Sequence, residues 1–350
     1  MSFNDERGAT RSPRLRAILN GTVVVGAIAA TVAHTASCGA ATFSLSVSLA
    51  ENANLDTAYW ANLTEARVKI QVSPRAPEPY MDLIEGYCDS IQLHPISGVV
   101  RLDGRDLSAS LLDTKTPTDF QNLTPTEIVT ILAKAHGLTP IVASTAAVAG
   151  RHYGNISNIL SLSQFAKLTS DWDVLVELAQ ASDFDLYVSG TALYFQQRQI
   201  AYENPQYIKY SELMDIKMDR LLPLSNGVDL TVLSWNSADQ YAVTQTVDTS
   251  MAGKSSDAGT WPARKYTVMR PNLSAASAQA LARRVAQSLS AAAMSIKFTM
   301  LGDAAMTVRR PVVLQGTDTI FDRPFKIESL TRSFRSRSGF SQVVRASQGS

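Results

Sequence analysis

The sequence predicts a mainly β fold interrupted by a small α+β unit. Short segments in which apolar and polar residues alternate recur up to about residue 120 and again after residue 200. Such alternation is typical of half-buried strands, and strands at this spacing favour a β-barrel or sandwich. Between them, helix-start signals and helical apolar spacing replace the alternation. We therefore expect three domains: two β domains at 15–120 and 201–350, and an α+β insertion at 121–200.

Composition excludes several classes of function. The chain has 350 residues, of which 45% are apolar and 18% charged, enough apolar matter for real cores. The chain has 32 Lys and Arg and 31 Asp and Glu residues, a net charge of +1. It therefore lacks the excess of basic residues that is typical of nucleic-acid-binding proteins. Two cysteines, Cys38 and Cys88, and four scattered histidines offer no metal-ligand spacing. Most metalloenzymes are therefore disfavoured.

The N-terminal stretch admits two interpretations. Residues 17–50 contain no Asp, Glu, Lys or Arg, four arginines precede them, and the run 23–30 is similar to the apolar core of a secretory signal. A weak lipoprotein cleavage pattern ends at Cys38. Alternatively, 15–19 forms a strand ended by an Asn20-Gly21 turn, and 43–49 forms another with Phe43, Leu45 and Val47 on one face. Local sequence does not decide between the two.

Strands and turns continue to residue 107. Residues 66–72 alternate, and a proline-rich turn follows them. A long strand or a bent pair is expected over 81–93, with Gly86 as a bulge or crossing point. Asp103-Gly104, placed after Val99-Val100-Arg101-Leu102, is typical of a two-residue hairpin turn. If that turn forms, Gly104→Val should strain it by about 1–3 kcal/mol.

The middle segment carries two helix starts. Thr124 and Glu127 form a capping box with Pro125 at the first helical position, and Gly137 ends the helix. A second cap begins at Ser170, ahead of a buried stripe that contains Trp172, Leu175, Val176 and Ala179. A hairpin follows at 185–195, turning at Ser189-Gly190.

The last third returns to strands. One is expected at 228–235, followed by a flexible loop at 251–262 rich in small residues. Ser274 caps a long helix at about 274–292, with Leu281, Val285 and Leu289 on one face. Further strands are expected at 296–301, 308–314, 325–334 and 340–346.

The sequence contains no known catalytic motif. The glycine-rich nucleotide loops, the zinc-protease helix and the serine-hydrolase elbow are all missing from the sequence. Asp171 and Asp173 diverge on a helix and are better explained as a cap and a complement to the helix dipole. His136 is expected to be structural, Cys38 and Cys88 to be buried on strands, and Trp172 and Trp235 to be core residues. We expect no catalytic, cofactor-binding or metal-binding residues, and no cofactor.

One basic cluster could face an acidic partner, line a channel or simply be a solvated strand face. Its members are Arg309, Arg310, Arg332, Arg335, Arg337 and Arg345.

Several segments together resemble the late-control D family of phages, the baseplate hub proteins of contractile tails, whose fold also forms the hub part of type VI secretion spike proteins. The core of 98–108, Gly104-Arg105-Asp106-Leu107, is similar to a family turn. The other matching segments are 125–138, 171–195, 301–303, 316–319 and 338–340. The similarity runs from about residue 15 to 347. It implies that 15–50 forms barrel strands and remains in the protein.

The resemblance implies two similar β-barrels per chain and a homotrimeric ring of pseudo-sixfold symmetry. Such a ring adapts a sixfold tail tube to a threefold central spike, so the partners would be the tube protein and the spike, with wedge or tape-measure proteins also possible. It implies a virion protein of the tail baseplate, assembled in the host cytoplasm, with no enzymatic activity and no specific nucleic-acid binding.

Two alternatives stay open. A secreted lipoprotein or solute-binding module rests on the N-terminal stretch alone, and intact mass would reveal processing near Cys38. A tail-associated cell-wall hydrolase would clear peptidoglycan in a zymogram.

Overall fold

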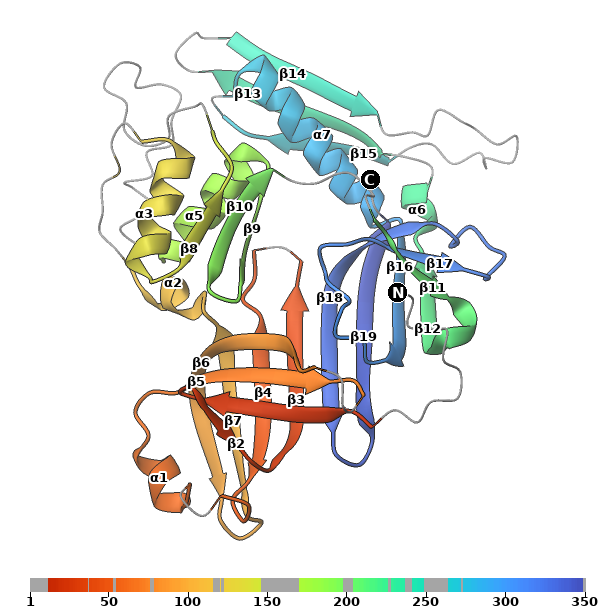
Figure 1. The fold of residues 1–350 in the computed structure, drawn as a ribbon. Coiled ribbons are helices and arrows are strands. Elements are labelled where there is room, and N and C mark those ends of the chain that lie inside the picture. Colours follow the sequence, from red (N-terminus) through yellow and green to blue (C-terminus); the bar gives the residue numbers. More distant parts are fainter. Residues whose placement is uncertain are drawn as a thin grey trace.

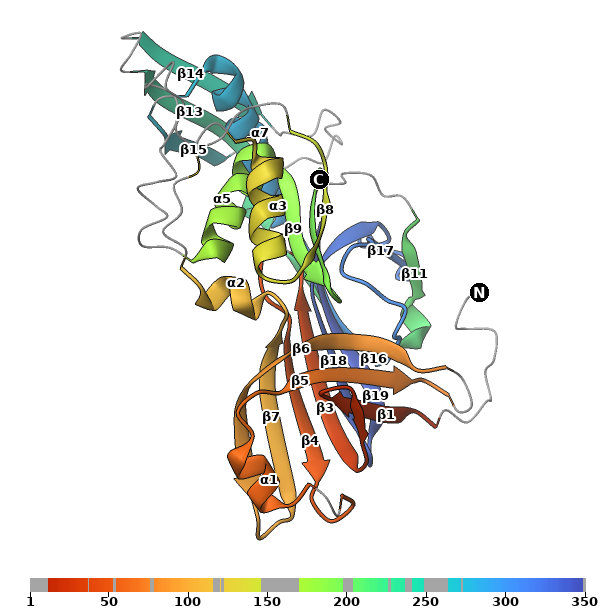
Figure 2. The same cartoon turned by 60° about the vertical axis from the view of Figure 1, so that its left-hand side comes forward.

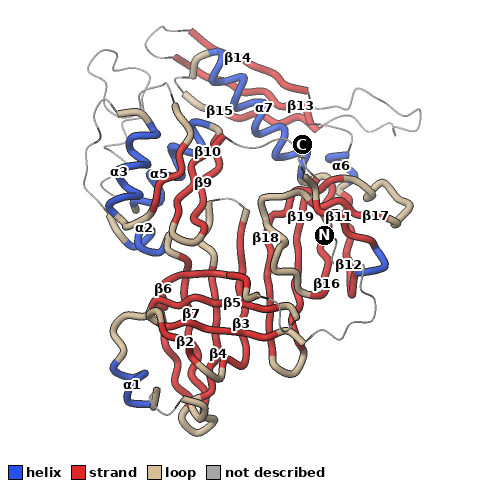
Figure 3. The backbone as a smooth tube through the Cα atoms, viewed as in Figure 1, coloured by secondary structure: helices blue, strands red, loops and turns tan. Residues whose placement is uncertain are grey.

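The computed structural model describes residues 12–36, 38–52, 55–75, 79–115, 120, 123–145, 170–197, 204–225, 228–236, 241–248, 264–271 and 273–348. The fold is mainly β, as predicted, and its strands gather in one large sheet and two three-stranded sheets (Figure 3). The loop predicted at 251–262 lies outside the described residues.

The first strand-rich region curls around its own core, and we call it the first barrel. Figure 2 shows β1, β5 and β6 crossing over β3, β4 and β7. The core contains Phe43, Leu45, Trp60, Ile70 and Leu102. Its elements are β1 (Arg14–Leu19), β2 (Thr22–Val24), β3 (Ala27–Thr35), β4 (Thr42–Ser48), α1 (Thr57–Asn62), β5 (Arg67–Ser73), β6 (Met81–His94) and β7 (Val99–Asp106).

The strand interpretation of 15–50 is confirmed. Asn20 and Gly21 have φ of 48° and 86° and turn β1 into β2, as the sequence predicts. β4 buries Phe43, Leu45 and Val47 and exposes the serines between them. β3 then pairs with β4 on one side and with the C-terminal strand β18 on the other.

Gly86 is a crossing point rather than a bulge. β6 pairs with β5 up to Gly86 and Tyr87 and with β7 from Gly86 onward, so the strand passes from one layer to the other there. A Cβ at Gly86 would lie 1.9 Å from the carbonyl oxygen of Arg105, a contact that only glycine avoids. The irregularity in the β6–β7 pairing falls instead between Cys88 and Ser90.

The predicted Asp103-Gly104 hairpin is wrong. β7 runs straight through both residues, and Gly104 lies opposite Phe43 of β4 and Cys88 of β6. The β6–β7 connection turns earlier, at Gly98, where φ is +66°. Glycine is needed at 104 for a different reason, because a Cβ there would lie 2.1 Å from the Tyr87 carbonyl oxygen and 2.6 Å from the Phe43 ring.

The middle segment is the predicted α+β unit. Both capping boxes form, from Thr124 to Glu127 and from Ser170 to Asp173, and Gly137 ends the first helix with φ of +70°. The hairpin turns at Gly190-Thr191, one residue later than the expected Ser189-Gly190, because Ser189 still pairs with Ala192. The elements are α2 (Ala109–Asp113), α3 (Pro125–Ala135), β8 (Thr139–Val142), α5 (Asp171–Ser182), β9 (Phe184–Ser189) and β10 (Ala192–Gln197).

A second set of strands encloses another core, and we call it the second barrel. Phe298, Phe325, Leu314 and Val344 are fully buried in it. The strand expected at 308–314 is shorter and starts at Val312. The elements are β11 (Gln206–Lys209), the 3-10 helix η1 (Tyr210–Glu212), β12 (Leu213–Arg220), β16 (Met294–Leu301), β17 (Val312–Gln315), β18 (Pro324–Arg335) and β19 (Gly339–Gln348).

Between β12 and β16 the chain builds a small layered unit that the sequence did not reveal as separate. A three-stranded sheet carries a long helix on one face, at the top of Figure 1. The helix begins after Ser274, as predicted, but its fully buried stripe is Ala278, Ala282 and Ala286, while the predicted leucine face is half-buried. The elements are α6 (Leu222–Ser225), β13 (Val228–Asn236), β14 (Tyr241–Asp248), β15 (Arg264–Met269) and α7 (Ala275–Ala291).

One continuous sheet joins the two barrels. Its strand order is β12-β16-β19-β18-β3-β4-β7-β6-β5-β1-β2, and the junction is the antiparallel pairing of β3 with β18 (Figure 1). Because β3 and β18 come from opposite ends of the sequence, the first barrel is completed by the C-terminal part of the chain.

Candidate functional site

The titratable residues of the α+β unit have structural roles. The Nε2 of His136 lies 2.9 Å from the Oδ2 of Asp171, and both side chains are almost fully buried. The Asp173 carboxylate instead accepts hydrogen bonds from the backbone and hydroxyl of Ser170. The two carboxylates therefore diverge, as the sequence predicts. The contact between His136 and Asp171 joins residues far apart in the sequence, and no local pattern signals it.

The described ranges contain no group of three or more His, Cys, Asp or Glu side chains able to hold a metal ion. Cys38 lies in a bend with φ of +40° and not on a strand, so its predicted placement is wrong. Cys88 is on β6 as expected but only half-buried. Trp235, predicted as core, is 55% exposed, whereas Trp172 is buried.

The Gly104-Arg105-Asp106-Leu107 segment joins the first barrel to the α+β unit. The buried carboxylate of Asp106 accepts hydrogen bonds from the backbone N–H of Ala41, at 2.9 Å, and from the backbone N–H of Ser108, at 3.1 Å. It also accepts one from the Ser108 hydroxyl. Leu107 enters the core of the α+β unit. Asp106 therefore ties the start of β4 to the start of α2.

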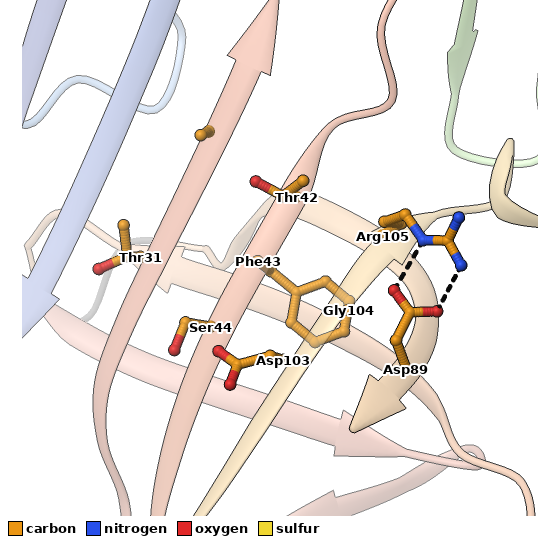
Figure 4. A pocket seen from close by; sticks show the side chains of 9 residues that line it. Thr31, Thr42, Phe43, Ser44, Asp89, Asp103, Gly104 and Arg105 are labelled. Carbon is orange, nitrogen blue, oxygen red and sulfur yellow. Dashed lines mark hydrogen bonds and ion pairs between the residues drawn. The ribbon is translucent and has the colours of Figure 1, made fainter. Parts of the chain in front are cut away.

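Arg105 lies beside a shallow pocket on the outer face of β3, β4 and β7 (Figure 4). Its guanidinium forms bidentate hydrogen bonds with Asp89, at 2.7 and 2.8 Å, and pairs with Asp113 at 2.7 Å. These carboxylates raise the pKa of Arg105, and Arg105 lowers the pKa of Asp113. The arginine is thus already neutralised. The pocket, about 340 Å³, is lined by Thr31, Ala33, Thr42, Phe43, Ser44, Asp89, Asp103, Gly104 and Arg105.

The predicted basic cluster divides into exposed arginines and arginines held by carbonyl groups. Arg335, Arg337 and Arg345 are exposed. Arg310 is half-buried and donates a hydrogen bond to the carbonyl of Asn204 at 2.8 Å. Arg332, only 5% exposed, donates hydrogen bonds to the carbonyls of Asp303 and Met306. Arg309 donates to the carbonyl of Ala36 at 2.6 Å and stacks 3.5 Å above the ring of Tyr187. The buried members therefore hold the structure together rather than face solvent.

The described residues between β3 and β4, 36 and 38–41, are held by both barrels and by the α+β unit. The carbonyl of Ala36 binds Arg309 and its N–H donates to Glu328, both in the second barrel. The carbonyl of Cys38 accepts the indole N–H of Trp172, from α5, at 2.9 Å. Together with the bond from Ala41 to Asp106, these contacts fix the α+β unit against both barrels.

His34, near the end of β3, is subject to the charges of two arginines. Burial, followed by the charges of Arg332 and Arg309, lowers the pKa of His34 to about 4. Its Nδ1 finds no hydrogen-bond partner among the described residues. His34 is therefore neutral in the folded protein at neutral pH, and protonation would place three cations together.

This arrangement makes the stability depend on pH. The unfolded chain binds a proton at His34 near pH 6.5 and the folded chain only near pH 4, so acidification favours unfolding between these values. The His34 contribution should cost up to about 3 kcal/mol on going from pH 7 to pH 4. Urea unfolding across this range should show a weaker pH dependence for His34→Leu than for the wild type. His94→Gln, at an exposed site, is the control, and an unchanged slope in His34→Leu would contradict the assignment.

An uncharged face extends across the junction of the barrels. Along β3, β4 and the stretch 329–333 of β18, the side chains that point away from the cores are small and uncharged, and many carry a hydroxyl group. Lys326, Glu328 and Arg335, nearer the ends of β18, are charged and exposed. On β3 and β4 the small outer side chains account for the absence of charge in 17–50, since the inner faces of these strands are buried and apolar. The pairing registers place Thr31 beside Ser44 and Ser333, and Ala33 beside Thr42 and Thr331.

The second barrel has two exposed edges joined by η1. Among the strands that the structure describes, β12 pairs only with β16, and β11 only with β17. Along this segment Tyr207, Tyr210 and Met214 are 61%, 48% and 63% exposed. Unpaired strand edges beside large exposed apolar side chains are suited to contact with another polypeptide.

No protein-family model and no curated protein sequence matches the chain. Solved structures do match. The 43 kDa tail protein of prophage MuSo2 from Shewanella oneidensis superposes with a TM-score of 0.68 at 14% identity, covering 96% of both chains. A tail protein from Neisseria meningitidis MC58 gives 0.71 at 12% identity, also with 96% of both covered.

A third likeness is to a component of the type VI secretion system from Escherichia coli, with a TM-score of 0.57 at 13% identity, over 94% of this chain and 76% of that one. At these identities the comparisons establish the fold. The expected likeness to phage tail proteins and to the type VI secretion system is confirmed at that level. No helix in the described part of the chain is long and apolar enough to cross a membrane.

Proposed function

We propose that the protein is the structural hub of a contractile tail baseplate, a homotrimeric ring between a sixfold tail tube and a threefold spike. The observation that carries the proposal is the continuous sheet that joins two barrels with separate cores in one chain. Three such chains present six barrels, so one face of the ring can match a sixfold tube. The fold shared with two phage tail proteins supports this role.

The roles of the parts follow from the same geometry. The exposed segment with Tyr207, Tyr210 and Met214 forms the contact between subunits, where a neighbour covers the open edge of the second barrel. The uncharged face of β3, β4 and β18 lines the axial channel, since small hydroxylated side chains neither bind nor repel a passing phosphate backbone. The chain acts by geometry and not by catalysis. We propose the same three domains as the sequence predicts, at 15–120, 121–200 and 201–350, for the subunit of this ring.

A charge at the subunit contact should weaken the ring. Met214→Lys places an ammonium group where an apolar side chain is expected to be buried. We expect the protein concentration at which half of the trimer has dissociated to rise at least about tenfold. Light scattering over a concentration series measures this. Ile96→Lys, in the exposed β6–β7 turn, is the control and should leave assembly unchanged.

The tube and spike contacts need a separate measurement. The protein should co-purify with both its tail tube protein and its spike, in one complex, with little dependence on salt because its net charge is only +1. A wild-type chain that stays monomeric at all concentrations and binds neither partner would overturn the hub proposal.

A further inference from the structure

The small sheet of β14, β13 and β15 ends in two strand edges of opposite character. β15 begins with Arg264 and Lys265, and Arg270 follows it. β14, at the outer margin of the molecule in Figure 1, has no charged residue from Tyr241 to Val247. Charge on an edge strand is a common protection against unwanted pairing, and residues 241–247 of β14 lack it.

Other edges among the described strands are short or protected. β2 and β11 have three and four residues. β8 contains a proline, and β9 contains Asp185. β12, which has the same length as β14, carries Asp215, Lys217 and Asp219. An edge strand with seven consecutive uncharged residues, ended by Asp248, is therefore a distinctive feature of β14.

The hydrogen-bond pattern shows which backbone groups of β14 point outward. The carbonyl of Leu233 in β13 accepts a hydrogen bond from the N–H of Arg270, so Leu233 directs its backbone groups toward β15. Leu233 lies opposite Thr244, which therefore directs its own N–H and C=O to the free edge. By alternation, Ala242 and Thr246 do the same.

The two faces beside this edge differ in chemistry. On one face, α7 packs against β13 and β14 and much less against β15, so the helix lies close to the β14 edge. The α7 helix carries two basic residues, Arg283 and Arg284, and no acidic one, and Arg283 is exposed. On the other face, Trp235 and Met269 are 55% and 76% exposed, and Trp235 lies next to the small Ala242.

We propose that the β14 edge binds an extended acidic segment of a partner polypeptide as an additional strand. The outward N–H and C=O groups of Ala242, Thr244 and Thr246 supply the main-chain hydrogen bonds. Acidic side chains of the segment lie on the α7 side, near Arg283, and apolar ones lie beside Ala242 and Trp235. A second copy of this chain fits less well, because it would bring another basic α7 to the same edge. The proposal does not depend on the hub function.

Two fluorescent peptides test this on the full chain: one alternates valine with glutamate over eight residues, and the other alternates valine with lysine. Anisotropy should give a Kd about tenfold lower for the glutamate peptide. Thr244→Pro removes one outward N–H without breaking a bond to β13, and it should raise that Kd at least about tenfold. Thr267→Pro is the matched control, since Thr267 directs its N–H outward from the β15 edge.

Arg283→Glu leaves β14 untouched and should reverse the preference between the peptides, which keeps the proposal testable even if Thr244→Pro does not fold. The proposal is overturned by equal affinity for both peptides, by no binding of either, or by an equal effect of Thr267→Pro. A concentration-dependent dimer abolished by Thr244→Pro would overturn it in favour of a second copy.

Discussion

Gly104→Val should prevent stable folding of the first barrel. The new Cβ would meet the Tyr87 carbonyl oxygen and the Phe43 ring at less than 3 Å. Both groups belong to strands that pair directly with β7, so they cannot move apart cheaply. We expect a loss of about 3 kcal/mol or more in the free energy of unfolding. Thermal unfolding followed by circular dichroism measures this.

Asparagine variants separate this cause from a turn requirement. Asparagine tolerates positive φ, so Gly98→Asn, in the true turn with open space around it, should cost no more than about 1 kcal/mol. Gly104→Asn should be nearly as damaging as Gly104→Val, because any Cβ clashes there. Tolerance of Gly104→Asn would restore the hairpin interpretation of Asp103-Gly104.

Asp106→Ala should be the second severe change. It removes the acceptor for the N–H groups of Ala41 and Ser108 and for the Ser108 hydroxyl, which leaves buried polar groups unsatisfied. The free energy of unfolding should fall by about 3 kcal/mol. Protease sensitivity should appear first around residues 36–41 and α2, the two segments that the carboxylate joins.

Asp113→Ala provides the comparison, because it also removes a carboxylate from the same region. Asp113 is exposed, and its partner Arg105 keeps the bidentate contact with Asp89, so the change should stay within about 1 kcal/mol. Urea unfolding measures both variants. If Asp106→Ala and Asp113→Ala lose the same free energy of unfolding, Asp106 does not anchor the two segments.

The elements that could be predicted from sequence depend on local chemistry. The capping boxes at Thr124 and Ser170 involve residues three apart, so their signals lie in one short window. The Asn20-Gly21 turn and the alternation of β4 are equally local. Helix and strand positions therefore agree with the structure wherever neighbours in sequence decide them.

The wrong predictions concern contacts between distant segments. Asp103-Gly104 has the residue types of a turn, but Phe43 and Tyr87, from other strands, keep β7 extended. Trp235 alternates like a core residue, and only the position of α7 decides that its face is the exposed one. α7 approaches its sheet through alanines because small side chains allow close packing, whereas the sequence draws attention to its leucines.

The candidate functional features were hidden for the same reason. The basic cluster could be predicted as a group, but its division into exposed and buried arginines depends on Ala36 and Tyr187, far away in sequence. The open edge of β14 is defined by which strands pair with it, and alternation alone is the same for edge and central strands.

The pairing of β3 with β18 has a consequence for synthesis in the cell. His34 lies opposite Leu330, so the native neighbour of β3 leaves the ribosome almost 300 residues later. At ribosomal speeds of roughly 5–20 residues per second, β3 waits about 15 to 60 s for that neighbour. During this interval its apolar edge is exposed on the nascent chain, where it can be bound by chaperones or can aggregate. The yield of folded protein in the cell should therefore depend more on the supply of chaperones and the speed of translation than on substitutions that stabilise the folded state.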